Sequence, residues 1–260
     1  MTANDIINII ESVAPLGQQA GWDNSGLQVG NRGTEVARVL LCTDITDLII
    51  EEAIEKNCKM IISHHPLLFR GIKRIEGNTR SERCVINAIR HNIVLYSSHT
   101  SMDNYLHGVS GKMADKLGIK NYQILSPLGT ETGLGVIGQL DQPLNLIEFL
   151  RLLKTTFVTQ SIKYVERLTD TNFISTVAIC GGAGSEFMET AISLQADAYV
   201  SADFKYHDLQ TADGRLNVFD IGHFESEQFT KEIFYELLTN TLVECIIAEN
   251  DISPVKTYVG

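Results

Sequence analysis

Two adjacent histidines, His64 and His65, directly follow a run of apolar residues in the stretch ISHHPLLF. Imidazole and carboxylate side chains recur at short spacings further along the chain: His99, Asp103, His223 and Glu227. Neutral imidazole and carboxylate are the usual protein ligands of zinc, manganese, iron and nickel. A turn that aims the two imidazoles at different ions would account for the pair, and such ions support metal-assisted hydrolysis.

Five of these residues form the predicted metal-ligand set: His64, His65, Asp103, His223 and Glu227. Five ligands exceed what one tetrahedral ion needs and suit two metals about 3.5–4 Å apart. His223 and Glu227 are four positions apart, a spacing that places both side chains on one helical face if a helix begins there. Each part also has a plainer interpretation as a surface turn, a helical ion pair or a helix cap. Metal binding is favoured because all five groups follow predicted strands.

Strands and helices alternate along the chain. The expected strands of the first half cover 36–46, 58–65 and 93–100, and the expected helices cover 3–15, 47–57, 79–92 and 108–119. The second half repeats the pattern. It begins with a strand and turn at 133–143 and a helix at 144–157, and the range 175–203 then holds a strand, a glycine turn, a helix and a strand in that order. A further strand and helix are expected within 215–240, and a final strand at 241–251. This alternation predicts parallel sheets covered on both faces. Ligands of such sheets gather beyond the carboxyl ends of the strands, where the histidines fall.

The sequence predicts an α/β protein with two halves that meet near residues 124 to 133. The first domain is expected to cover residues 1–125 and to be completed by the C-terminal segment 235–260. The second domain is expected to cover residues 126–234. Because no low-complexity segment or long linker separates the halves, we expect them to pack tightly.

The composition argues against a nucleic-acid-binding protein and against a membrane protein. The chain has 260 residues and a formal net charge of -11, without a dense Lys/Arg cluster, so nucleic acid is not an expected partner. Its five cysteines form no CxxC pair, which indicates reduced thiols in a cytosolic protein. The N-terminal segment carries acidic residues, and no apolar run approaches the roughly 18 residues of a membrane helix. We therefore expect a cytoplasmic protein that has no membrane segment.

Seven stretches, in order along the chain, resemble the Nif-three-like family, whose members are often labelled type-2 GTP cyclohydrolase I homologues. They are WDNSGLQVG, CTDIT, SHHPLLF, SSHTSMDN, VAICGGAG, ADAYVSADFKYHD and DIGHFESE. The match runs from Trp22 to Glu227, and the ordinary spacing between the halves resembles the short form of the family, which lacks an inserted middle domain.

The resemblance implies two similar, intertwined, three-layer α/β/α domains and assembly as a toroidal homohexamer. It also implies two divalent metal ions per subunit, with ligands at the same five positions: His64, His65, Asp103, His223 and Glu227. His99 is implied to lie near the metals, as a group that supports a ligand or contacts substrate. One departure from the family is Ser201-Ala202-Asp203, where members commonly have Thr-Gly-Asp or Thr-Gly-Glu; Asp203 and His207 remain.

The expected function is that of a dinuclear metal-dependent hydrolase. Two divalent ions can lower the pKa of a bound water to about 7, so that hydroxide attacks a nucleotide or related heterocycle. In a GTP cyclohydrolase-like reaction the attack is on C8 of the purine, with His99 and His207 as proton shuttles. The alternative is a metal-binding ring that has a regulatory or scaffold role and no catalysis.

Two further features have two interpretations each. The glycine segment at 180–184 could present backbone N–H groups to a phosphate, but a tight turn between strand and helix is favoured because the segment lacks a complete phosphate-binding motif. Trp22 could stack on a base, or it could close the edge of the core.

Overall fold

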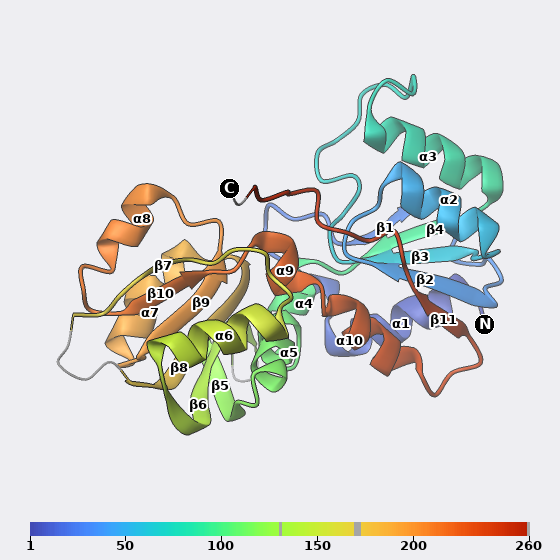
Figure 1. Ribbon diagram of the computed structural model, residues 1–260. Helices are drawn as coiled ribbons and strands as arrows, with labels where there is room; N and C mark the ends of the chain where they lie inside the picture. The colour runs from blue at the N-terminus through green and yellow to red at the C-terminus, as the bar shows by residue number, and fades with distance from the viewer. Residues whose placement is uncertain (130–131, 169–172, 259–260) are drawn as a thin grey trace. The chain divides into compact units, whose positions relative to one another are not determined.

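The computed structural model describes residues 1–129, 132–168 and 173–258, and it divides into two compact α/β units (Figure 1). Unit 1 consists of Met1–Met102 and Thr230–Ile252. Unit 2 consists of Asp103–Phe229 and the segment from Ser253 onward. The two units are interleaved along the chain, because the chain returns to unit 1 after completing most of unit 2.

The boundary between the units lies earlier than the sequence indicated. The expected boundary was at 125/126 with a return at 235, whereas the units divide at 102/103 and 229/230. Helix α5 (Val109–Lys116) packs against the sheet of unit 2, and strand β5 (Lys120–Pro127) pairs with β6 (Gly133–Asn145) in that sheet. A strand that pairs with the next strand along the chain belongs to the same sheet, so α5 and β5 belong to unit 2.

The sheet of unit 1 has the order β1-β4-β3-β2-β11. Its strands are β1 (Gly26–Val29), β4 (Val94–Ser97), β3 (Met60–Ser63), β2 (Arg38–Cys42) and β11 (Glu244–Ile247). Four strands run parallel as expected, while β1 joins β4 in the antiparallel direction at one edge. Every residue of β3 and β4 is buried, as parallel strands with both faces covered require.

Four helices cover this sheet, two on each face (Figure 1). They are α2 (Asp47–Glu55) and α3 (Arg80–His91) on one face, and α1 (Ala3–Val13) and α10 (Thr230–Leu238) on the other. Three of them begin at a threonine: the hydroxyls of Thr2, Thr46 and Thr79 each accept the backbone N–H three residues later. Such caps satisfy donors that the first helical turn leaves unpaired.

The sheet of unit 2 has the order β5-β6-β8-β9-β10-β7. Its remaining strands are β7 (Lys163–Val165), β8 (Phe173–Ala183), β9 (Ala198–Ala202) and β10 (Asn217–Asp220). Strands β8, β9 and β10 are parallel, whereas β5, β6 and β7 add antiparallel pairs that the alternation of elements did not predict. The sheet is therefore mixed.

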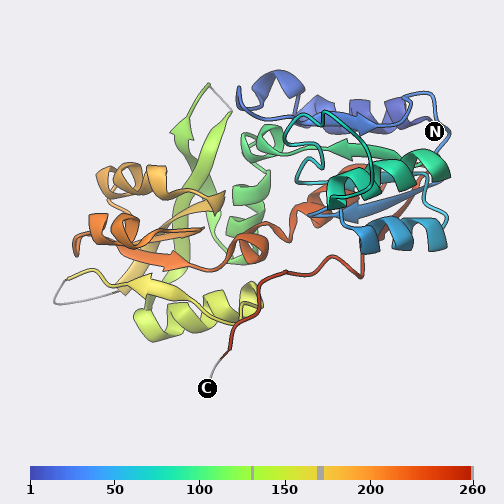
Figure 2. The same ribbon diagram turned by 90° about the horizontal axis from the view of Figure 1, so that it is seen from above.

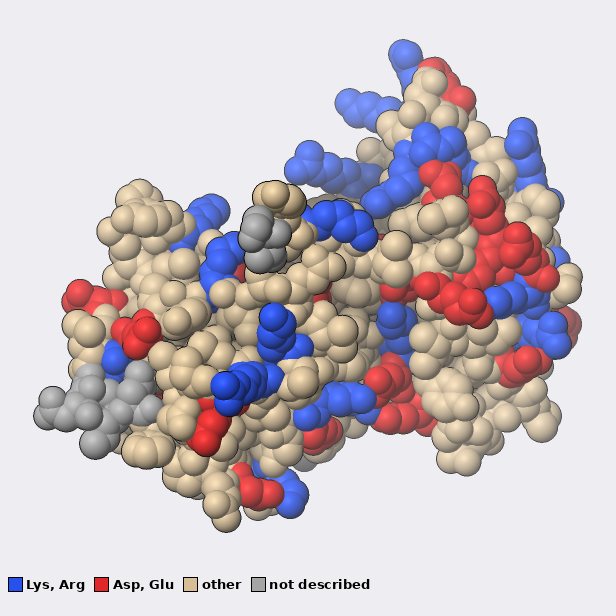
Figure 3. Space-filling model, in the orientation of Figure 1, with Lys and Arg blue, Asp and Glu red and all other residues tan. Residues whose placement is uncertain are grey.

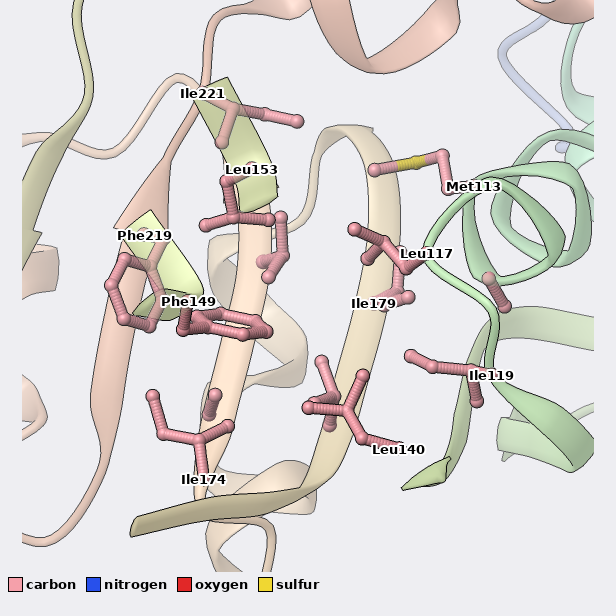
Figure 4. Packing of buried hydrophobic residues seen from close by; sticks show 14 of the residues in the cluster. Met113, Leu117, Ile119, Leu140, Phe149, Leu153, Ile174, Ile179, Phe219 and Ile221 are labelled. Carbon is pink, nitrogen blue, oxygen red and sulfur yellow. The ribbon is translucent and has the colours of Figure 1, made fainter. Parts of the chain in front are cut away.

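Helices again cover both faces of this sheet, so unit 2 also has three layers (Figure 2). Helices α5 and α6 (Leu146–Thr156) lie on one face, and α7 (Met188–Ser193) and α8 (Tyr206–Thr211) lie on the other. Figure 4 shows Phe149 and Leu153 of α6 packed against Phe219 of β10. The ring centroids of Phe149 and Phe219 are 5.1 Å apart in an edge-to-face arrangement, which aromatic quadrupoles favour.

Two short helices complete the elements that matter for the site. Helix α4 (Thr100–Asp103) follows β4, and helix α9 (His223–Glu227) follows β10. Within the described ranges, no helix is both long enough and apolar enough to cross a membrane.

Candidate metal centre

Three histidine rings meet at the carboxyl ends of β3 and β4 in unit 1. His64 and His65 follow β3 directly, and His99 follows β4 after one intervening residue. Because β3 and β4 are parallel neighbours, their ends lie side by side. The ring centroids are 4.8 Å apart for His64 and His65, and 5.2 and 5.3 Å from these two rings to His99. One ligand atom of each ring lies within 4.8 Å of the others, so this trihistidine cluster can hold a metal ion.

Each ring of the trihistidine cluster is anchored through its Nδ1 atom. The acceptors are the Ser98 carbonyl oxygen for His64 at 3.2 Å, Asp44 Oδ1 for His65 at 3.1 Å and Asp23 Oδ1 for His99 at 2.8 Å. A carbonyl or carboxylate oxygen only accepts, so each Nδ1 must donate, and a neutral ring then carries its lone pair on Nε2. Histidines that bind metals are oriented by bonds of this kind.

Asp23 is a site residue that the sequence analysis did not single out. Its side chain is fully buried and accepts bonds from His99 Nδ1, the Thr100 N–H and the hydroxyls of Thr100 and Ser25. Burial by itself raises the pKa of Asp23, but the bonds from His99, Thr100 and Ser25 outweigh it and hold the pKa well below its usual range. Asp23 is therefore an anion at neutral pH that fixes the His99 ring.

Asp44, the anchor of His65, belongs to a loop that the C-terminal part of unit 1 supports. Asp251 accepts bonds from the backbone N–H groups of Thr43 at 2.9 Å and Asp44 at 3.4 Å. Lys231 Nζ lies 2.7 Å from Asp251 Oδ2, and the Asp251 side chain is 2% exposed. This buried ion pair holds the loop that carries Asp44.

The strand-end rule that found the histidines did not find these two anchors. Asp44 lies two residues beyond the end of β2, but it falls inside the longer strand that the sequence predicted over 36–46. Asp23 lies just before β1, and because β1 is antiparallel, its start lies at the edge where β4 ends, with Gly26 opposite Ser97. The second case was inaccessible because the sequence pattern predicted only parallel strands.

Unit 2 contains a second set of donors on and around α9. The helix begins at His223, which is the condition under which the spacing places both side chains on one face, and it brings His223 Nε2 within 3.0 Å of Glu227 Oε2. His223 Nδ1 lies 2.8 Å from Asp203 Oδ2, just beyond the end of β9. Asp203 therefore orients the His223 ring through Nδ1, as Asp23 orients the His99 ring. The segment Ser201-Ala202-Asp203, which departs from the sequence common in the family, keeps this carboxylate.

The carboxylates of this set concentrate negative charge. Burial raises the pKa of the Cys180 thiol, and the charges of Asp103, Glu186 and Glu227 raise it further. Two predicted ligands, Asp103 and Glu227, therefore act on the same buried thiol. The Glu227 side chain is 4% exposed, and a cation beside it would offset the cost of burying its charge.

The glycine segment serves this helix and not a phosphate. Strand β8 continues to Ala183, with a register shift in its pairing after Ile179, so the expected turn is part of a strand. Gly182 has a φ of +64°, and a Cβ there would lie 2.3 Å from Glu227 Oε1. Its N–H donates to Ser226 Oγ at 2.9 Å, and the N–H of Gly181 donates to Ser110 Oγ. These two N–H groups are bonded within the protein, and the expected tight turn at 180–184 is wrong in that residues 180–183 are the end of β8.

His207, one of the two predicted proton shuttles, lies on the exposed helix α8. Its Nδ1 atom is 3.0 Å from Gln210 Oε1, and its ring packs against Tyr206. Its role stays a prediction. The convergence of all five predicted ligands on one metal pair involves residues of both units and also stays a prediction. Within unit 1, the ring of His99 lies close enough to those of His64 and His65 that it could be a third ligand, in addition to the supporting role expected for it.

The comparisons with known proteins agree with the resemblance that the motifs indicated. A protein of Clostridium perfringens named GTP cyclohydrolase 1 type 2 homolog is 36% identical over 230 residues, which cover 87% of each chain. A Clostridium acetobutylicum protein of the same name is 32% identical over 266 residues and 98% of each chain. The solved structure of a Bacillus cereus protein related to NIF3 matches with a TM-score of 0.91 and 21% identity over 99% of each chain. A family model described as Duf34/NIF3 (NGG1p interacting factor 3) matches residues 1–254, and the chain belongs to this family.

Proposed function

We propose that the chain is a metal-dependent hydrolase that binds two divalent ions. The trihistidine cluster supplies donors in unit 1, and Asp103, His223 and Glu227 supply donors in unit 2. The observation that carries the proposal is the anchoring of three neighbouring imidazoles through Nδ1, two of them by carboxylates. A histidine cluster that served only packing would not need its rings held with the lone pairs on Nε2.

The donor types fit the expected metals. Imidazole and carboxylate suit zinc, iron, manganese and nickel. A divalent ion, when bound, supplies Lewis acidity and activates water for hydrolysis at neutral pH. Asp23 and Asp44 keep the rings of His99 and His65 oriented and hold the proton on Nδ1.

The proposed substrate is a nucleotide or a related heterocycle. The name of the curated relatives, GTP cyclohydrolase 1 type 2 homolog, supports this class, as does the proximity of exposed aromatic rings to His99. His99 and His207 are the proposed proton shuttles. We also propose a homohexamer, as the resemblance implies, and a cytoplasmic location, which the five free cysteines support.

The test combines metal analysis with an activity screen. Protein purified without added metal is expected to contain about two divalent ions per chain, and the metal-loaded protein is expected to hydrolyse a compound in a nucleotide and heterocycle panel. His223→Ala should remove metal and turnover, while His91→Ala, on α3 and exposed, should change neither. Full metal occupancy without any turnover across the panel would refute the hydrolase and favour the non-catalytic ring.

A further inference from the structure

Two exposed aromatic side chains lie beside the trihistidine cluster in unit 1. Trp22 is 64% exposed and Phe69 is 46% exposed. Their ring centroids are 5.9 Å apart, and they lie 6.0 and 6.4 Å from the His99 ring. Large aromatic surfaces are normally buried, so a pair held in solvent next to a candidate metal centre indicates a contact surface for a ligand.

The aromatic pair stands on a fixed backbone. Asp23, the neighbour of Trp22, is held by bonds from His99, Thr100 and Ser25. Asn24 Nδ2 donates to the Leu68 carbonyl oxygen at 2.7 Å, which ties the Trp22 loop to the segment that carries Phe69. Trp22 therefore does not close the core edge, as one interpretation of the sequence had it. It forms part of a preorganised platform.

Three basic side chains follow Phe69 along the same loop. They are Arg70, Lys73 and Arg74, all exposed. Figure 3 shows Lys and Arg side chains projecting from this loop, the segment that precedes α3 in Figure 1. Across the parts of the chain that the structure describes, none of the recorded ion pairs involves these three groups. In a chain of net charge -11 they concentrate positive charge on this loop, which favours the approach of an anion.

The end of this loop is attached to α3. Glu82, in the first turn of α3, accepts the backbone N–H groups of Glu76 and Asn78, each at 3.0 Å. The basic segment thus runs between two attachments, at Leu68 and at Glu82. Its side chains extend from a loop of defined path that starts at the aromatic platform.

We propose that this surface binds a phosphorylated planar heteroaromatic ligand, such as a nucleoside triphosphate. The planes of the Trp22 and Phe69 rings are 63° apart, so the ligand ring stacks on Trp22 and contacts Phe69 edge to face. Arg70, Lys73 and Arg74 bind the phosphates. The ring, and not the phosphates, then lies beside His99. This proposal rests on the proposed function, because it names the ligand of the same site and the orientation of that ligand. Its test measures ligand binding and does not depend on turnover.

Trp22 is the only tryptophan of the chain, so its fluorescence reports this surface directly. In metal-free protein kept in a chelator, GTP is expected to quench the fluorescence to saturation. Guanosine should quench with roughly tenfold weaker affinity, because it lacks the phosphates. Inorganic tripolyphosphate should compete with GTP without quenching, and added salt should weaken GTP more than guanosine.

Variants separate the two parts of the surface. Phe69→Ala should weaken the binding of GTP and of guanosine alike by up to about tenfold, the effect of losing one edge-to-face aromatic contact. The double variant Lys73→Gln/Arg74→Gln should weaken GTP by about tenfold and leave guanosine unchanged. The matched control Arg151→Gln/Lys154→Gln, on exposed positions of α6 in unit 2, should change neither affinity.

Three results would overturn the proposal. They are GTP that fails to quench, a single-stranded oligonucleotide that binds more tightly than GTP, and a blue shift of Trp22 fluorescence that rises with protein concentration in the absence of ligand. The second result would indicate a nucleic-acid surface, and the third would indicate a face between copies of the chain. Metal content and turnover are measured separately, so failure of the hydrolase proposal and failure of this one are distinguishable.

Discussion

Asp23 accepts a hydrogen bond from His99 Nδ1 at 2.8 Å while its own side chain is fully buried. The carboxylate stays ionised because further donors, Thr100 and Ser25, surround it. A residue that lies outside the predicted ligand set thereby orients one of the imidazoles. The same arrangement recurs in unit 2, where Asp203 lies 2.8 Å from His223 Nδ1.

Asp23→Asn is expected to weaken metal binding in unit 1 by about 10–100-fold, the usual effect of losing an anchor of a metal-binding histidine. The amide is neutral and can be turned so that it donates toward His99, which loosens the ring. Metal affinity is measured by competition with a chelator, alongside circular dichroism as a check on folding. Asp141→Asn, whose carboxylate is 70% exposed, serves as the control. Unchanged affinity in a folded Asp23→Asn protein would contradict the anchoring role.

Gly182→Ala is expected to displace Glu227 and reduce metal binding in unit 2. An added Cβ would lie 2.3 Å from Glu227 Oε1, and the positive φ adds about 1 kcal/mol of backbone cost. Gly118→Ala separates the two effects, because Gly118 also has a positive φ but no atom within 4 Å of its Cβ. Metal content and urea unfolding are measured for both. If both variants retain full metal content, the close approach of Gly182 to Glu227 is not required for metal binding.

Glu52→Gln is expected to destabilise unit 1 by about 2 kcal/mol, since charged hydrogen bonds are lost. The Glu52 side chain is 2% exposed and accepts bonds from Lys56 Nζ at 2.8 Å and from the backbone N–H groups of Glu249 and Asn250. Burial alone raises the pKa of Glu52, but these bonds outweigh it and lower the pKa below its usual value.

The lowered pKa of Glu52 fixes the direction of the pH effect. The stabilisation is fully present above the unfolded-state pKa of about 4.3 and is lost as the pH falls through the folded-state pKa. Urea unfolding between neutral and acidic pH should show the difference between wild type and Glu52→Gln shrinking toward acid. Glu55→Gln, exposed on the same helix, is the control. A difference that is constant with pH would argue against an ionised Glu52.

Asp251→Asn is expected to cost about 3 kcal/mol, because the buried Lys231 would lose its charged partner. The loop that carries Asp44 would loosen with it, so metal affinity in unit 1 should fall as well. A double-mutant cycle with Lys231→Met isolates the coupling between the two charges by urea unfolding. Additive effects of the two substitutions would show that the ion pair contributes no coupling energy.

The sequence by itself determined the α/β class, most of the elements and the residues most capable of metal chemistry. Buried parallel strands read as short apolar runs, and the groups that follow them must lie at one sheet edge, so His64, His65 and His99 could be placed together. The four-residue spacing of His223 and Glu227 was enough to predict their common helical face, because that face depends only on local helical geometry.

The tertiary structure alone decided the edges of the sheets and the anchors of the imidazoles. The antiparallel direction of β1 brings Asp23 to His99 from 76 positions away along the chain, and no local pattern encodes such a pairing. The continuation of β8 through its glycines depends on how closely α9 approaches, which is also a long-range contact. Periodicity and spacing report the geometry of one element, whereas hydrogen bonds between loops depend on how several elements pack together.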